Sequence, residues 1–172
     1  MILPLVLTIY VRVYYFIELL SDNVLIGCVY KPPDSDVASF TTNFDQLLTV
    51  INKRKQMCYI AGDFNIDLLK FERHVPTSNF VNCIFSHSFF PAINKPTRIT
   101  SSTATLIDNI YTNVVHSHSI LPYIIYSDIS DHLPLFVQTK LLVHTKSNRL
   151  TYRRIHNEAN KTKFISNLQA TD

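Results

Sequence analysis

Tryptophan is absent from this chain of 172 residues, and glycine and cysteine are scarce, with two and three copies respectively. The cysteines, Cys28, Cys58 and Cys83, have no paired spacing, and two of them lie inside apolar runs. This pattern indicates neither a disulfide framework nor a zinc knuckle, and it favours reduced, buried thiols in an intracellular protein. The sequence also has no repeat and no low-complexity tract.

The composition is that of one folded domain with a basic tail. Hydrophobic residues make up 47% of the chain and aromatic residues 12%, which is enough apolar material for a single core. The formal net charge is +3, and residues 141–172 hold six Lys or Arg residues against two acids, so the rest of the chain is nearly neutral. A basic tail suits nucleic acid or an anionic membrane, but solvated tails are commonly basic as well, and both interpretations stay open.

Residues 1–20 are apolar enough to imitate a signal peptide or a membrane anchor. Arg12 and Glu18 interrupt the run, no positively charged region precedes it, and no small-residue cleavage site follows it. Residues 5–17 are instead rich in β-branched and aromatic side chains, which suit buried strands. We therefore expect strands here and no membrane partner, with a targeting or anchoring segment as the alternative.

The rest of the chain alternates between strand and helix signals. Apolar side chains at helical spacing predict a helix over residues 40–51, capped by Asp36 or Ser39, and a shorter helix near 80–87. Short apolar runs predict strands at 24–30, 57–61, 89–93, 106–111, 120–126 and 133–143. The pattern predicts an α/β or α+β domain in which strands outnumber helices, followed by a linker from Thr145 onward.

The segment Gly62-Asp63-Phe64-Asn65 stands at the end of one predicted strand. On extended backbone, Asp63 and Asn65 point to the same side, which would place a carboxylate for a metal or water beside an amide for a phosphoryl oxygen. Glycine at position 62 would allow a tight turn or the close approach of a phosphate. The alternative is an Asx-type turn that closes the strand.

A second polar cluster, Ser130-Asp131-His132, follows a strand and lies on a predicted loop. Histidine next to a carboxylate is suited to proton transfer and to stabilising charge on phosphorus. Asp108 lies in an apolar run, where an unpaired acid is costly to bury, and His132 is the partner that its chemistry suggests. The alternative is that Asp108 faces solvent at a strand end.

These clusters, together with Tyr30-Lys31-Pro32-Pro33 and Pro96-Thr97-Arg98, occur in the order seen in the endonuclease/exonuclease/phosphatase superfamily. The chain resembles that superfamily over about residues 20–140, and within it the endonuclease domain of non-long-terminal-repeat retrotransposons, which is related to apurinic endonucleases. The resemblance implies part of a four-layer α/β/β/α sandwich and Mg²⁺-assisted (or Mn²⁺-assisted) hydrolysis of DNA phosphodiesters. It also implies a parent element fused to a reverse transcriptase. We expect the protein to act inside the cell, with the nucleus as one of the compartments that stay open.

The resemblance assigns roles to individual side chains. It implies that Asp63 binds metal and orients or deprotonates the attacking water, and that Asn65 holds the scissile phosphate. It implies that His132, oriented by Asp108, stabilises the phosphorane or transfers a proton. It further implies phosphate contact by Tyr30, metal binding by Asp131, and contacts of Arg98 and Lys31 with the DNA backbone.

The resemblance is incomplete in the N-terminal part of the domain. There the family has an asparagine and a metal-binding glutamate before the segment that matches residues 24–30. Glu18 is the sole glutamate there, and it lacks the surrounding pattern. We therefore divide the chain into an apolar strand-like segment (1–19), a partial domain that supplies the C-terminal portion of the sandwich (20–143), and a basic linker or tail (144–172). We expect weak or lost nuclease activity, with two alternatives: a phosphoesterase of the same superfamily, or a non-catalytic nucleic-acid-binding remnant.

Overall fold

The computed structural model describes residues 2–9, 12–19, 23–114 and 120–139, together with Lys161, Thr162 and Ser166. For 2–9 and 12–19 it describes the strands and their pairing alone. The strand prediction for the apolar N-terminal segment is confirmed, because β1 (Ile2–Ile9) pairs antiparallel with β2 (Arg12–Leu19). The prediction of a basic tail over residues 144–172 lies outside the described residues apart from those three.

The centre of the fold is a six-stranded sheet with strand order β1-β2-β3-β4-β8-β5. Its other strands are β3 (Val24–Tyr30), β4 (Met57–Asp63), β5 (Phe90–Pro91) and β8 (Asp108–Thr112). β3 and β4 are parallel and are joined by helix α1 (Val37–Arg54), whereas β8 pairs antiparallel with both β4 and β5. The predicted mixed α/β class is therefore confirmed.

Helix α1 forms where the apolar periodicity predicts it. Its buried side chains are Phe40, Phe44, Leu47, Leu48 and Ile51, which recur on one face. Of the two predicted caps, Asp36 is the N-cap, since its Oδ2 accepts a bond of 2.7 Å from the Ser39 backbone N–H. The helix ends at Lys55, whose left-handed backbone closes the last turn.

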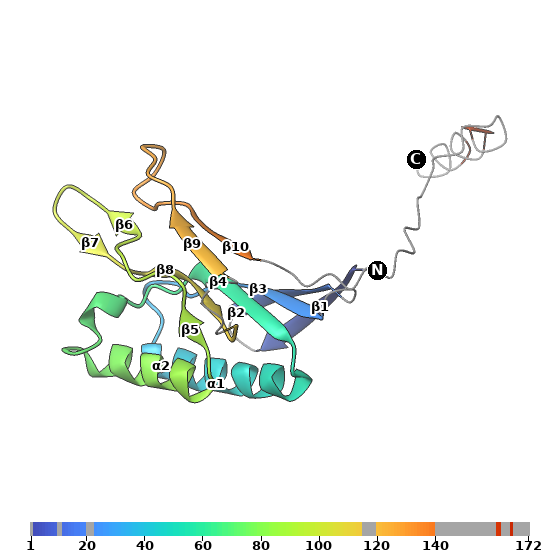
Figure 1. Ribbon diagram of the computed structural model, residues 1–172, viewed down its shortest axis with the longest axis horizontal. Helices are drawn as coiled ribbons and strands as arrows, with labels where there is room; N and C mark the ends of the chain where they lie inside the picture. The colour runs from blue at the N-terminus through green and yellow to red at the C-terminus, as the bar shows by residue number, and fades with distance from the viewer. Residues whose placement is uncertain are drawn as a thin grey trace.

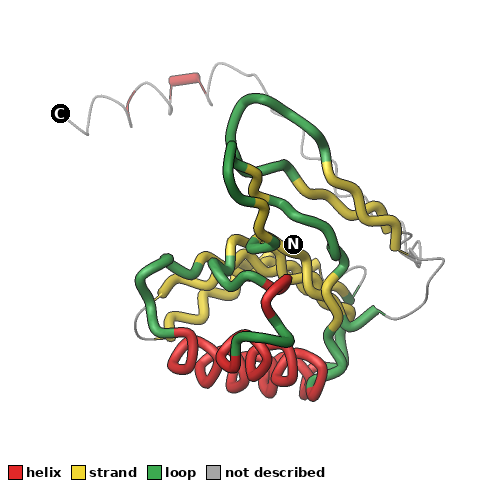
Figure 2. Tube along the Cα trace, turned by 90° about the vertical axis from the view of Figure 1, so that its left-hand side faces the viewer, coloured by secondary structure: helices red, strands yellow, loops and turns green. Residues whose placement is uncertain are grey.

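Helix α2 (Val75–Ser86) is longer at its N-terminus than the prediction near 80–87, and Pro76 occupies its first turn, a position where proline is well tolerated. Figures 1 and 2 show α1 and α2 lying together on one face of the large sheet. An aromatic cluster fills the space between helices and sheet, and its rings belong to Phe40, Phe44, Phe64, Phe80 and Tyr111. Because Phe64 follows Asp63 directly, this core also anchors the loop that begins the candidate site.

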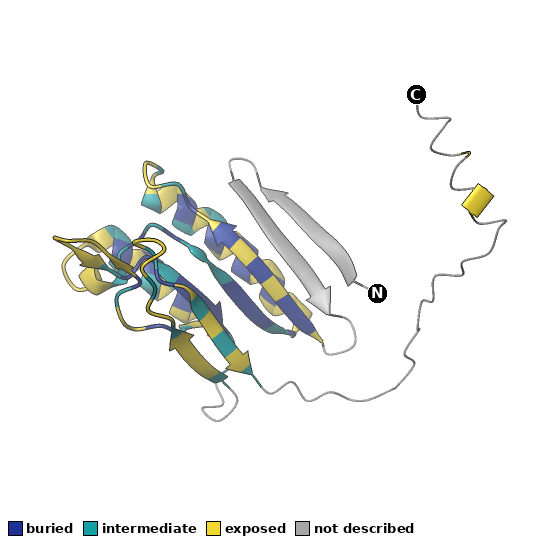
Figure 3. Ribbon diagram, turned by 90° about the horizontal axis from the view of Figure 1, so that it is seen from above, coloured by how far each residue is buried: buried dark blue, intermediate teal, exposed yellow. Residues whose placement is uncertain are grey.

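The opposite face of the sheet is covered by a second, two-stranded sheet of β9 (Ile120–Ile124) and β10 (Leu135–Thr139), as Figure 1 shows. Val24, Tyr59 and Ile110 of the large sheet are buried against this hairpin. On β3, however, Ile26, Cys28 and Tyr30 are exposed on the face turned away from the helices, which gives the strand its alternating bands in Figure 3. The described residues thus form helices, a large sheet and a small sheet, which are three of the four predicted layers.

The expected strand at 89–93 is shorter than predicted, and a hairpin of β6 (Arg98–Ile99) and β7 (Ala104–Thr105) was missed. Strands of two residues carry no detectable periodicity, so sequence patterns do not find them. A one-turn 3₁₀ helix, η1 (Leu68–Lys70), follows β4 and is capped by Asp67. Within the described part of the chain, every helix is too short or too polar to cross a membrane.

Candidate active site at the strand ends

Three of the predicted site residues lie in a row across neighbouring strands. Tyr30 at the end of β3 is the parallel partner of Asp63 at the end of β4, and Asp63 is the antiparallel partner of Asp108 at the start of β8. Directly paired residues on adjacent strands place their side chains on the same face of a sheet. The sheet register therefore brings together residues that are far apart in the sequence.

Position 62 requires glycine because strands β3 and β4 pack closely there, and not because the chain turns. Neither glycine has a positive φ angle, and a Cβ atom built on Gly62 would lie 1.8 Å from the backbone oxygen of Val29 on β3. Gly62 lies inside β4, so the tight turn expected at this position is absent. Strands β3 and β4 approach too closely at this point for any side chain.

Asn65 is held by hydrogen bonds on both sides. Its backbone φ of 47° is left-handed, a conformation that asparagine tolerates better than most residues, and its N–H donates to Asp63 Oδ1 at 3.0 Å. Its Nδ2 donates to the Lys31 carbonyl at 2.8 Å. The Asx-type turn is therefore present, and it fixes Asn65 beside Asp63. The second hydrogen of the amide remains available for an outside acceptor.

His132 and Asp108 meet as their chemistry suggested. His132 Nδ1 lies 3.1 Å from both carboxylate oxygens of Asp108. This contact assigns Nδ1 to the carboxylate and leaves Nε2 as the nitrogen that can face a substrate. The potential ligand atoms of Asp63, Asp108 and His132 all lie within 4.8 Å of one another. We call these three residues the strand-end cluster.

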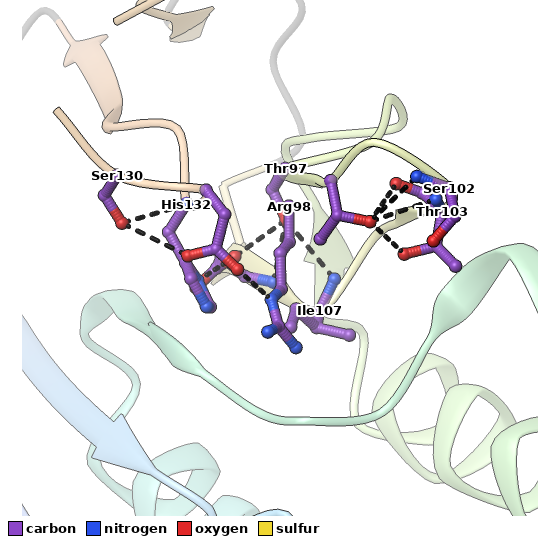
Figure 4. Close-up of polar contacts among 10 residues, drawn as sticks. Thr97, Arg98, Ser102, Thr103, Ile107, Ser130 and His132 are labelled. Carbon is purple, nitrogen blue, oxygen red and sulfur yellow. Dashed lines mark hydrogen bonds and ion pairs between the residues drawn. The ribbon is translucent and has the colours of Figure 1, made fainter. Parts of the chain in front are cut away.

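Thr97 supports the cluster, although sequence reasoning gave this residue no role of its own. It is fully buried, and its hydroxyl donates to Asp108 Oδ2 at 2.8 Å. The same hydroxyl oxygen accepts from the backbone N–H groups of Asp108 at 3.0 Å and Ile107 at 3.3 Å. Figure 4 shows Thr97 and His132 approaching the site from separate segments. The only sequence signal was its place inside the Pro96-Thr97-Arg98 motif.

Thr97→Val is expected to lower the free energy of unfolding by about 1–3 kcal/mol, because it removes one donor from Asp108 and leaves two backbone N–H groups without their acceptor. Urea denaturation of the variant would measure the loss. Thr97→Ser keeps the hydroxyl and serves as the matched control. Equal stability of the valine and serine variants would contradict a supporting role for the hydroxyl.

Arg98 and Asp131 bind each other beside the strand-end cluster. Arg98 Nε lies 2.7 Å from Asp131 Oδ2, and the Ile99 N–H donates to the Asp131 carbonyl at 2.8 Å. The hydrogen bond from Arg98 holds the pKa of Asp131 below its usual range. Asp131 is not among the three residues whose ligand atoms converge, so the structure does not place the predicted metal ligand with the others. Its observed side-chain partner is Arg98.

Tyr30 and Lys31 differ in accessibility although they are neighbours. The Tyr30 side chain is 54% exposed at the edge of the cluster, where a substrate can reach it. Lys31 is fully buried, and its Nζ donates to the Pro32 carbonyl at 3.2 Å. The structure therefore does not favour the predicted contact of Lys31 with a DNA backbone, because a buried ammonium group cannot meet a phosphate from outside.

The electrostatics of Asp63 favour a nearby cation. Burial raises the pKa of this carboxyl group, and the Asp108 carboxylate raises it further, whereas the Asn65 N–H and His132 act in the opposite direction. Two carboxylates held side by side repel each other unless a positive charge lies between them. Their oxygens are the ligand type that hard divalent cations prefer. The donor set therefore fits such an ion.

Asp63→Asn is expected to raise the free energy of unfolding at pH 7 in EDTA. Because the pKa of Asp63 is higher in the folded state, ionisation costs stability as the pH rises through and above the ordinary value of 3.8. The gain should therefore shrink as the pH falls toward that value. Thermal unfolding across pH would test this, with the exposed Asp128→Asn as control. A neutral or destabilising effect at pH 7 would count against charge repulsion at Asp63.

A cleft of about 340 Å³ adjoins the cluster. Asn65, Arg98, Lys70 and His74 line it together with Asp67. The two cations are paired with carboxylates, Lys70 Nζ with Asp67 Oδ2 at 3.4 Å and Arg98 with Asp131. Sequence reasoning did not connect Lys70 or His74 with the site, because they lie on and beside η1, an element without an apolar pattern. The cleft offers room for a substrate next to the strand-end cluster.

Comparisons with known proteins agree on the fold. A family model described as endonuclease-reverse transcriptase matches residues 24–136. The chain is similar to the endonuclease domain of TRAS1, a telomere-specific non-LTR retrotransposon, with a TM-score of 0.65 and 15% identity over 82% of this chain and 70% of that one. No curated protein sequence matches the chain.

Two further solved structures are similar over less of their length. An endonuclease/exonuclease/phosphatase family protein from Leptotrichia buccalis has a TM-score of 0.52 and 16% identity over 74% of this chain and 53% of its own. The 3′ phosphatase NExo from Neisseria, bound to a product DNA hairpin, has a TM-score of 0.54 and 13% identity over 75% of this chain and 65% of its own. Similarity at such low identity shows a shared fold.

Proposed function

Because the chain belongs to the endonuclease-reverse transcriptase family, whose model covers residues 24–136, we propose that the strand-end cluster hydrolyses phosphodiester bonds in DNA. The observation that carries this proposal is the convergence of the ligand atoms of Asp63, Asp108 and His132 within 4.8 Å, next to a cleft that Asn65 and Arg98 line. Two carboxylates and an imidazole can position water, move a proton and hold a divalent cation at one phosphorus atom.

The chemistry assigns each side chain a task. Asp63 orients the attacking water and accepts its proton. His132, whose Nδ1 is held by Asp108, presents Nε2 to the phosphoryl oxygens and stabilises their growing charge. Asn65 donates from its amide, and Tyr30 contacts the phosphate from the neighbouring strand end.

Asp63 and Asp108 would hold the Mg²⁺ or Mn²⁺ ion that the family resemblance implies. Such an ion supplies positive charge to the phosphoryl oxygens when it is bound. We propose weak metal binding and slow turnover, and we do not assign Asp131 as a ligand, because it is paired with Arg98.

A polymeric anion suits the surroundings of the cluster better than a small phosphoester. Arg98 and Lys70 line the adjacent cleft, so a strand that crosses the cluster could offer its phosphates to them in exchange for their carboxylate partners, Asp131 and Asp67. One of the similar structures, NExo, is itself bound to a DNA hairpin. We also propose an adjoining reverse transcriptase in the parent element, in line with the family description, and action on DNA in the nucleus.

Nicking of supercoiled plasmid by the purified chain in Mg²⁺ tests the proposal, with EDTA and a His132→Ala variant as controls. Slow nicking that EDTA abolishes and His132→Ala strongly reduces would support it. Absence of nicking by a folded sample that still retards DNA in a gel would overturn it in favour of a binding remnant. Hydrolysis of a small phosphomonoester without any DNA cleavage would overturn it in favour of a phosphatase.

A further inference from the structure

A second cluster of metal-ligand side chains lies between the two helices. Asp45 belongs to α1, whereas Cys83 lies on α2 and His87 caps its C-terminal end. His87 Nε2 is 2.8 Å from Asp45 Oδ1, and Cys83 Sγ is 3.7 Å from the same oxygen. The potential ligand atoms of the three residues all lie within 4.8 Å of one another. This helix-face cluster shares no residue with the strand-end cluster.

The imidazole of the helix-face cluster is held in place from several sides. The backbone N–H of His87 bonds to the Ile84 and Phe85 carbonyls, which closes the last turn of α2. Asn52 Nδ2 donates to the His87 carbonyl at 3.1 Å and lies 3.3 Å from His87 Nδ1. The His87 side chain is only 15% exposed. Nε2 is therefore directed at Asp45, and turning the ring would break its contacts with Asp45 and Asn52.

We propose that Asp45, Cys83 and His87 form a binding site for a zinc-class divalent cation. Thiolate sulfur, imidazole nitrogen and carboxylate oxygen are the ligands that Zn²⁺ uses, at about 2.3 Å from sulfur and about 2.0–2.2 Å from nitrogen and oxygen. Donor atoms separated by 2.8 and 3.7 Å can surround one such ion with small side-chain shifts. Three protein ligands leave a fourth tetrahedral position, which water would occupy.

The helix-face cluster and the strand-end cluster differ in their ligand atoms, and therefore in the metal ion that each would prefer. A hard ion such as Mg²⁺ prefers oxygen ligands and has no use for a thiolate, whereas sulfur and nitrogen select zinc or its analogues. Because one ligand comes from α1 and two from the end of α2, a bound ion would tie the two helices together.

Absorption spectroscopy with Co²⁺, a Zn²⁺ analogue, tests the site in the full chain. We expect one equivalent of Co²⁺ to produce tetrahedral visible bands and a near-ultraviolet thiolate band, and Zn²⁺ to displace it. Cys83→Ser should remove the thiolate band, and Asp45→Asn should weaken binding by at least about tenfold. Cys28→Ser, at an exposed cysteine outside the cluster, is the matched control and should keep the band.

Thermal unfolding provides a second readout that does not depend on cobalt. Zn²⁺ should raise the midpoint for the original chain and for Cys28→Ser, but not for Cys83→Ser, because only the folded cluster gathers the ligands. A folded protein that gives no thiolate band would overturn the proposal. A band that survives in Cys83→Ser, or one that is lost in a His132→Ala variant, would overturn it as well.

Discussion

Replacing His132 with alanine is expected to lower the rate of metal-dependent DNA nicking by about 10²–10³-fold, the range typical for loss of one donor that stabilises charge in the transition state. The imidazole is held by Asp108 through Nδ1 at 3.1 Å, so alanine removes the donor and leaves the partly buried Asp108 carboxylate without this partner. Initial rates of plasmid nicking at saturating Mg²⁺ would measure the loss.

The His132–Asp108 pair should act as a unit, which a double-variant experiment can test. Asp108→Asn removes the carboxylate that orients the imidazole, so it should also slow nicking, while the double variant should be little slower than His132→Ala alone. Asp128→Asn changes an exposed carboxylate outside both clusters and is the matched control for Asp108→Asn. Rate losses that multiply in the double variant would show that the two side chains act independently.

Gly62→Ala is expected to destabilise the protein by about 3 kcal/mol or more, at or above the upper end of the usual cost of adding a methyl group to a packed region. The new Cβ would lie 1.8 Å from the Val29 carbonyl oxygen, and a backbone atom cannot rotate away as a side chain can. Strands β3 and β4 would have to separate beside Asp63. A lower urea midpoint, together with loss of nicking, is the expected result.

The neighbouring substitution Ala61→Ser separates this clash from the general effect of altering β4. Ala61 is partly buried in the same strand and packs against the smaller apolar cluster, so one added oxygen there should cost much less than a methyl at Gly62. Equal stability losses for the two variants would mean that the approach of Val29 to Gly62 is not what excludes a side chain.

Much of the fold could be predicted because the signals are local. Helix α1 repeats Phe40, Phe44, Leu47 and Ile51 on one face and begins at a capping aspartate, so its bounds follow from residues near one another in sequence. Strand β3 likewise follows from one apolar run ended by two prolines. The two-residue strands β6 and β7 were missed because pairing partners, not periodicity, define them.

Within the candidate site, the contact between Asp108 and His132 could be predicted from the sequence. An acid in the apolar run at Asp108 needed compensation, and His132, 24 residues away, supplies it. Nothing in the local sequence required Thr97 to bond the same carboxylate, or Asp131 to pair with Arg98. Those contacts follow from the β6–β7 hairpin, which sequence reasoning did not find.

The sequence by itself determined the mixed α/β class, the apolar faces and the polar residues at the strand ends, because each depends on spacing within a few residues. Only the tertiary structure decided that Lys31 is buried, that Gly62 faces the Val29 carbonyl, and that Asp45 meets His87 across 42 residues. Burial and long-range contacts depend on which surfaces pack together and in what register. A short stretch of sequence therefore does not predict either of them.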